Sequence, residues 1–424
     1  MGVRELRSLW KNRNFTILYS GQLVSSIGNN LFLLALPWFI YTTTHSRADM
    51  IWVGLATTIP GLVGLFSGVY VDRFPKRMVM LLSDLIRMLL MLLLAVFGFL
   101  HLSVALTIAG VFFLEAVGMF FMPASRALLP LIVKPEEQPA AVGFDQSSNA
   151  MVSLVSQAVG GVLYVWLGGP ILFLLNAISF LSSIFTLPMI RVEEKIEKRA
   201  HASFFSDWKA GLQTMYQSSL FFWISISAMI FNIGTAGLSI LLPMWIKTGL
   251  HLNASWLGVM MGAIALGDVV GGLFIGALTK IFSFQQGILL GGFTISIFFA
   301  GVGIVPNPYA DTVFLFIGSM GGALMMSVTA LKLMSAPGTL RGRLFATMNG
   351  FARLMTPLGM VLVGVLSMYM DLRWVFVICG ALVVMGLLRM IFPIRDDMAN
   401  LQIKADSEAV ITESSIGEEP VVES

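Results

Sequence analysis

Long apolar runs, each bounded by charged residues or by Gly and Pro, follow one another along almost the whole chain of 424 residues. Each run is apolar nearly all round for about 20 residues, the length of an α-helix that crosses a bilayer. An outer-membrane barrel would instead show alternating segments of about ten residues. The sequence therefore predicts an all-α membrane protein with twelve transmembrane helices. They are expected near residues 15–41, 51–71, 78–99, 104–123, 141–168, 170–190, 219–246, 254–279, 284–305, 311–333, 344–370 and 373–393.

The composition agrees with a lipid environment and excludes several other classes of protein. Apolar residues make up 57% of the chain and charged residues 12%, whereas soluble domains carry about 25% charged residues. The single cysteine, Cys379, excludes a disulfide framework and a cysteine metal cluster. The sequence has neither a phosphate-binding loop that ends in Gly-Lys-Ser/Thr nor a metal-ligand spacing. We therefore expect no enzyme activity, no cofactor and no metal.

The positions of Lys and Arg predict the direction of each helix, because these charges resist translocation across the membrane. Most of them lie at the N-terminus, in the 72–77 loop, in the central charged stretch and near the C-terminus. Only Arg47, Lys247 and Arg373 fall on the opposite side. We therefore expect a multi-pass protein with both termini in the cytoplasm. Its basic surplus is expected to face anionic lipid and not nucleic acid.

A charged stretch in the middle of the chain divides the expected helices into six and six. A weak internal repeat supports this division, because Gly64 and Gly68 of the second helix correspond to Gly272 and Gly276 of the eighth. Two pseudo-symmetric six-helix halves are the layout of many secondary transporters. The expected units are an N-terminal bundle, a cytoplasmic linker, a C-terminal bundle and an acidic, disordered cytoplasmic tail, over 1–190, 191–218, 219–393 and 394–424.

The most specific motif in the chain follows the second expected helix. It reads Gly68-Val-Tyr-Val-Asp72-Arg73-Phe-Pro75-Lys76-Arg77. This segment resembles the loop between helices two and three of the major facilitator superfamily, although Pro75 stands where that pattern usually has Gly. Further stretches look like the drug:proton antiporter branch that includes bacterial macrolide exporters. They lie at 83–87, 122–130, 340–343 and 357–359.

This resemblance implies a major facilitator fold in a bacterial cytoplasmic membrane and transport by alternating access. The carboxylate of Asp72 would cap the N-terminal end of a facing helix, near Arg343 to Thr347, and so lock the cytoplasmic side. The residues of the expected gating motif are Gly68, Asp72, Arg73, Lys76 and Arg77. Its basic residues have an alternative role, because their positive charge would also fix the orientation of the helices in the membrane.

Ionisable groups at membrane depth cost roughly 2.5–3.5 kcal/mol on insertion scales, so each is expected to have a partner or a function. Asp84 and Arg87 are three residues apart on one helix and can pair. Together with Arg353 they are expected to form a structural charge network beneath the cytoplasmic gate. Glu115 has no basic residue within four positions on its helix, so it is the first candidate for proton or cation coupling. Asp268 is the second.

Each coupling candidate has a structural alternative. Glu115 can pair permanently with Arg87, and Asp268 can make a static hydrogen bond to another helix. The resemblance also has two departures that bear on coupling. The fourth expected helix has Glu115 and lacks the intramembrane Arg of larger proton-coupled exporters, and the fifth lacks the Gly-Pro pair of the antiporter motif. Proton antiport is therefore left open.

By resemblance, the substrate cavity would be lined mainly by helices one, four, seven and ten. Helix one carries a polar stripe at helical spacing in an otherwise apolar span. Such an uncharged stripe among Phe and Met favours a bulky amphiphile, and its alternative role is hydrogen bonding between packed helices. The expected cavity residues are Gln22, Ser26, Asn29, Asn232 and Thr235.

These observations favour a monomeric secondary exporter of amphipathic, drug-like small molecules, with inward proton flow as a candidate driving force. Export of an endogenous siderophore or lipid is a second interpretation. A non-transporting membrane sensor is a third, against which the gating motif and the two-half layout argue.

Overall fold

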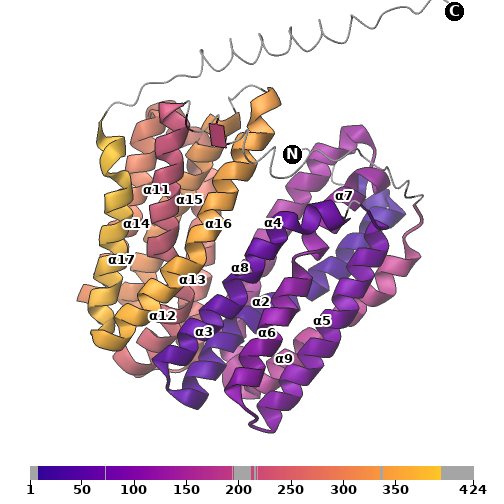
Figure 1. The fold of residues 1–424 in the computed structure, drawn as a ribbon, viewed down its shortest axis with the longest axis horizontal. Coiled ribbons are helices and arrows are strands. Elements are labelled where there is room, and N and C mark those ends of the chain that lie inside the picture. The colour runs from indigo at the N-terminus through magenta and orange to yellow at the C-terminus, as the bar shows by residue number, and fades with distance from the viewer. Residues whose placement is uncertain are drawn as a thin grey trace, which may run out of the picture.

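The computed structural model shows two groups of helices side by side (Figure 1). The described residues are almost entirely α-helical and contain no strand. They comprise 8–71, 73–192, 194, 212–213, 216, 218–334 and 338–392. Most of the expected linker and all of the expected acidic tail therefore lie outside the described residues.

The first helical group holds the helices before the expected linker, and the second holds the helices after it. The first group consists of α2 (Arg13–Thr44), α3 (Arg47–Thr58), α4 (Pro60–Val71), α5 (Lys76–Phe99), α6 (Val104–Gly118), α7 (Phe121–Ile132), α8 (Gln138–Leu167) and α9 (Gly169–Thr186). The second group consists of α11 (Ser219–Ala236), α12 (Leu238–Met244), α13 (Ala254–Ile281), α14 (Phe284–Ile304), α15 (Pro308–Met334), α16 (Gly338–Tyr369) and α17 (Leu372–Leu387). Short 3-10 or π turns extend some of these helices, as η1 (Pro135–Glu137), η2 (Leu187–Met189), η3 (Trp245–Gly249) and η4 (Leu388–Ile391).

Among the described residues, ten helices or unbroken helical runs are long and apolar enough to cross a membrane. They correspond to ten of the twelve expected spans, and the chain is therefore a multi-pass integral membrane protein. The expected span 373–393 is the shorter apolar helix α17, of 16 residues. The expected span 51–71 is divided between α3 and α4.

The division of this span has a local cause in the sequence. The last helical residue of α3 is Thr58, and Pro60 begins α4. Proline has no backbone N–H to donate, and its ring clashes with the carbonyl four residues earlier, so an uninterrupted helix is unfavourable here. Helix two of the expected layout therefore consists of two shorter helices joined at Ile59.

Side chains just before several helices explain where those helices begin. Asn12 accepts a hydrogen bond from Phe15 N at the start of α2, and Ser46 accepts one from Asp49 N at the start of α3. The start of α14 has a capping box, in which Ser283 and the third residue of the helix exchange hydrogen bonds. These caps satisfy N–H groups that have no partner within the helix.

The two groups are closed against each other at one end and splayed at the other (Figure 1). We call the end where α2 begins the near face, and the end where α3 begins the far face. Towards the far face, a methyl group at Gly161 of α8 would overlap the carbonyl oxygen of Ala254 in α13. On α4, towards the near face, a methyl group at Gly61 or Gly68 would meet nothing within 4 Å. Among the described residues, the closest glycine contacts between the groups thus lie towards the far face.

Candidate functional site

A cluster of charged and polar side chains lies inside the first helical group. Arg87 of α5 donates to Asn29 Oδ1 of α2 at 3.0 Å and lies 3.5 Å from a carboxylate oxygen of Asp84. Arg87 also acts electrostatically on Glu115 of α6. Its guanidinium carbon lies 4.6 Å from the ring centre of Phe180 in α9. The guanidinium therefore connects four helices of the first group.

The expected charge network is only partly assembled. Asp84 is 1% exposed, and Arg87 forms its ion pair with Asp84 and not with Glu115 among the described residues. Glu115 is half-buried, so it is not sealed inside the helix packing. Arg353 lies exposed on α16, in the other helical group. The structure thus places Glu115 beside the Asp84–Arg87 pair and keeps Arg353 apart from it.

The basic residues of the expected gating motif contact their own helical group. Arg77 Nε lies 3.0 Å from Glu194 Oε1, and Arg77 also donates to the carbonyl of Ile190. The backbone N–H of Lys76 donates to Glu194 as well. Glu194 therefore holds the first turn of α5 at the end of the first group. Its role was not predicted, because Glu194 is one of three acids in the charged segment 191–199, with Glu193 and Glu197, and no pattern sets it apart from them.

The other members of this motif carry less structural information. Asp72 lies outside the described residues, so its expected capping role stays a prediction. Arg73 is exposed, with its guanidinium 5.9 Å from the ring centre of Tyr70. Gly68 faces open space, as noted above for α4. In this arrangement the near ends of the two groups are apart.

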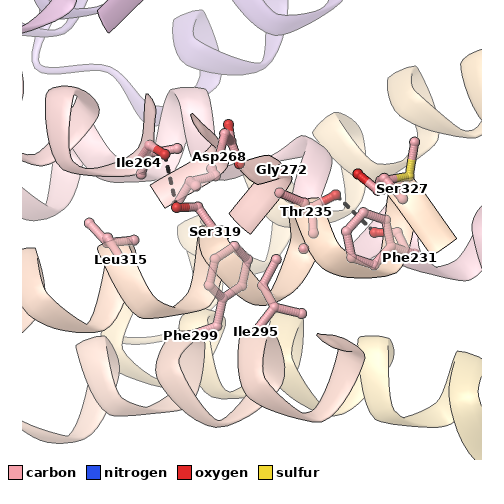
Figure 2. Close-up of a pocket in the computed structure, with 14 residues that line it drawn as sticks. Phe231, Thr235, Ile264, Asp268, Gly272, Ile295, Phe299, Leu315, Ser319 and Ser327 are labelled. Atoms are coloured by element: carbon pink, nitrogen blue, oxygen red, sulfur yellow. Dashed lines mark hydrogen bonds between the residues drawn. The ribbon is translucent and has the colours of Figure 1, made fainter. Parts of the chain in front are cut away.

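A cavity of about 410 Å³ lies among the helices of the second group. It is bounded mainly by apolar and small side chains from α11, α13, α14 and α15, and Figure 2 shows how they surround it. Its apolar lining side chains are Phe231, Leu238, Ile264, Ile295, Phe299, Leu315, Ala323 and Met326. A cavity of this size falls within the range that holds small organic ligands.

Few polar groups line this cavity, and they come from the side chains of Thr235, Asp268, Ser319 and Ser327. Thr235 and Ser319 use their hydroxyl hydrogens on backbone carbonyls, Thr235 with Phe231 O at 2.9 Å and Ser319 with Ile264 O at 2.8 Å. Asp268 is exposed and is the only charged residue among the described residues that line the cavity. Figure 2 shows its carboxylate directed away from Phe299. The cavity thus combines an apolar interior with an acidic edge.

The expected cavity residues are divided between different surroundings. Thr235 lines the cavity of the second group. Asn232, on the same helix, donates to Ala228 O at 2.8 Å. On α2, Gln22 donates to Ser125 at 2.8 Å, and Ser26 lies beside it, half-buried. The amides of Gln22 and Asn29 therefore connect α2 to neighbouring helices of the first group.

The structure also contains a buried acid that was not predicted to matter. Asp311 is fully buried, and its Oδ2 accepts a hydrogen bond of 2.8 Å from Trp245 Nε1. Its other oxygen has no hydrogen-bond partner in the described part of the chain. In the sequence, Asp311 marks only the first residue of an expected span, which is an ordinary place for an acid near a helix N-terminus.

Comparisons with known proteins agree with this architecture. A family model described as transmembrane secretion effector matches residues 8–416. The chain is 24% identical over 409 residues to macrolide efflux protein A of Streptococcus pyogenes, across 93% of this chain and 98% of that protein. It is also 24% identical over 362 residues to the multidrug efflux pump Tap of Mycolicibacterium fortuitum, across 81% and 87%.

A solved structure shares the fold at low sequence identity. The crystal structure of a bacterial homologue of the iron transporter ferroportin, in an inward-facing state, superposes with a TM-score of 0.70. The two chains are 14% identical, and the match covers 89% of this chain and 98% of the other. At this identity the likeness concerns the arrangement of helices and not the solute that is carried.

Proposed function

Because this chain belongs to the transmembrane secretion effector family of the major facilitator superfamily, we propose that it is a secondary active exporter of amphipathic small molecules. Members of the superfamily carry small molecules across membranes, and the relatives named above are efflux proteins. The proposal places this chain, as a monomer, in a bacterial cytoplasmic membrane.

The cavity of the second group is the observation that carries the proposal. Its walls are apolar, with the aromatic rings of Phe231 and Phe299 among them, and its rim carries Asp268. Such a surface favours a ligand with a large apolar body and a few polar groups, because the lining hydroxyls of Thr235 and Ser319 already donate to backbone carbonyls. A strongly hydrophilic solute would lose its hydration without compensation.

The arrangement of the two groups supports transport by alternating access. They pack at the far face and separate towards the near face (Figure 1). The distribution of Lys and Arg predicts that the near face is cytoplasmic. In this arrangement, a compound from the cytoplasm or the inner leaflet would reach the space between the groups, as an exporter requires before its outward step.

Proton coupling is proposed to use Glu115. Its half-buried position, and its neighbour Arg87, would allow a proton and the positive charge of Arg87 to compete for the same carboxylate. Arg87 already has a second anionic partner in Asp84. Glu115 would therefore gain and lose a proton without leaving Arg87 unpaired.

A binding screen followed by a transport assay tests the function. Purified protein is heated with amphipathic antibiotics, siderophores and lipids, because a ligand that binds the folded state raises its unfolding temperature. Stabilising compounds are then tested for uptake into everted membrane vesicles. We expect amphipathic antibiotics to stabilise the protein and accumulate. Stabilisation and accumulation of a siderophore or lipid alone would favour the second interpretation, and no accumulation of any compound would contradict export.

A cavity-filling variant links that result to the cavity. Ala323 lines the cavity on α15, so Ala323→Phe is expected to remove the ligand-induced stabilisation. Ala330→Phe is the matched control, because Ala330 is exposed on the same helix. Equal ligand binding by both variants would place the binding site elsewhere.

A further inference from the structure

The far face contains a contact between the two helical groups that involves a charged side chain. Arg47, the first residue of α3, donates through Nη1 to the backbone carbonyl of Ser367. The same nitrogen lies 3.4 Å from the carbonyl oxygen of Met370. Ser367 lies in the last turn of α16 and Met370 directly follows that helix, and both are more than 300 positions from Arg47 along the chain. The guanidinium therefore crosses from the first group to the second.

The acceptors are groups that a helix end leaves without partners. The last four carbonyls of an α-helix have no intrahelical donor, and together they carry a partial negative charge. Ser367 is fully buried and lies within the last turn of α16. A guanidinium suits this position, because it is permanently charged and carries several donors in a fixed plane. Arg47 thus supplies α16 with the C-terminal cap that its own sequence lacks.

Two further close contacts between α3 and α16 follow this cap along the two helices. A methyl group at Gly364 would overlap Ile51, one turn along α3 from Arg47. A methyl group at Gly54 would lie 3.0 Å from Met360 Sδ. From one contact to the next, the residue number rises along α3 and falls along α16. The two helices therefore run antiparallel and touch closely at this end. Separation of the groups at the far face would break all three contacts together.

The start of α3 holds Arg47 ready for this contact. Ser46 caps the helix by accepting from Asp49 N at 3.2 Å, which fixes the backbone on either side of Arg47. The other basic residues of the far face are placed differently. Arg373 is exposed in the second group, and its backbone N–H donates to Asp371 at 2.9 Å. Arg373 therefore matches Arg47 in charge and lies at the same face, and among the described residues no contact of Arg373 with the opposite group is seen.

We infer that Arg47 is a positioning residue of the transport cycle, which stabilises the far-face-closed arrangement by capping the C-terminal end of α16. This inference rests on the proposed function, because it matters only if the two groups alternate between arrangements. The cap exists only while α3 lies on α16. It therefore raises the population of the arrangement that is splayed at the near face and opposes opening of the far face.

The inference is tested by a distance measurement that does not depend on transport. Spin labels are attached to cysteines at Ser103 and Val305, which are exposed at the far face in different helical groups. In Arg47→Ala, we expect the ratio of long to short distances to rise about tenfold, as the loss of one charge-assisted cap predicts. Arg47→Lys keeps the charge and is expected to show a smaller rise.

Arg373→Ala is the matched control, with an unchanged distance distribution expected. An unchanged distribution in Arg47→Ala, or an equal change in Arg373→Ala, would overturn the inference. If Arg47→Ala fails to fold, Arg47→Gln replaces it, because Gln keeps a longer, polar side chain than Ala and removes the charge. The outcome is separate from the proposed function: a shifted distribution without export refutes only export, and export with an unshifted distribution refutes only the role of Arg47.

Discussion

Among single residues, the carboxyl of Glu115 carries the sharpest prediction, because it shares Arg87 with Asp84. Gln matches the size of Glu but cannot release a proton, so Glu115→Gln is expected to abolish transport driven by a pH gradient in proteoliposomes. Folding should persist, since Arg87 keeps its pair with Asp84. Glu115→Asp, which retains an ionisable group, is the control and should keep measurable coupling. Full coupling in Glu115→Gln would remove Glu115 from the proton role.

At the scale of elements, the far face depends on how closely α8 and α13 approach. Gly161 leaves no room for a side chain beside Ala254 and Gly258. Gly161→Leu should therefore push the two helices apart and destabilise this packing by about 1–3 kcal/mol, seen as a lower unfolding temperature and a longer Ser103–Val305 label distance. Val162→Leu, at an exposed neighbouring position, should change neither quantity. A normal label distance in Gly161→Leu would show that other contacts close the far face.

For the whole molecule, the prediction concerns the balance between near-face and far-face closure. Asp72 is expected to act on the facing helix near Arg343 to Thr347, which lie in the N-terminal part of α16 (Gly338–Tyr369), and so lock the near face, although Asp72 lies outside the described residues. Asp72→Asn should therefore favour the splayed arrangement of Figure 1 and increase labelling of a cysteine at Gly68 from the near side. Glu136→Gln removes an exposed acid near the same face and should leave labelling unchanged. An unchanged pattern in Asp72→Asn would refute the gating role.

The sequence predicted the membrane helices far better than the contacts between them. Apolar runs mark a span regardless of its neighbours, but the division of the expected span 51–71 before Pro60 was not predicted. The cavity was less predictable, because an apolar residue looks the same in the sequence whether it faces lipid or a cavity. Phe299 of α14, which lines the cavity, is an example. For Arg47, the sequence predicted only a basic residue on the side of the membrane opposite the cytoplasm. Its partners are backbone carbonyls, which no sequence pattern marks.

The division of the second expected helix at Ile59 has a mechanical consequence. Because α3 ends at Thr58 and α4 begins at Pro60, a bend at Ile59 requires little more than a change in a few backbone dihedrals. The α4 piece can then swing towards the second helical group while α3 stays seated on α16. We therefore expect the cycle to pass through an occluded intermediate, in which the solute is enclosed and neither solution reaches it.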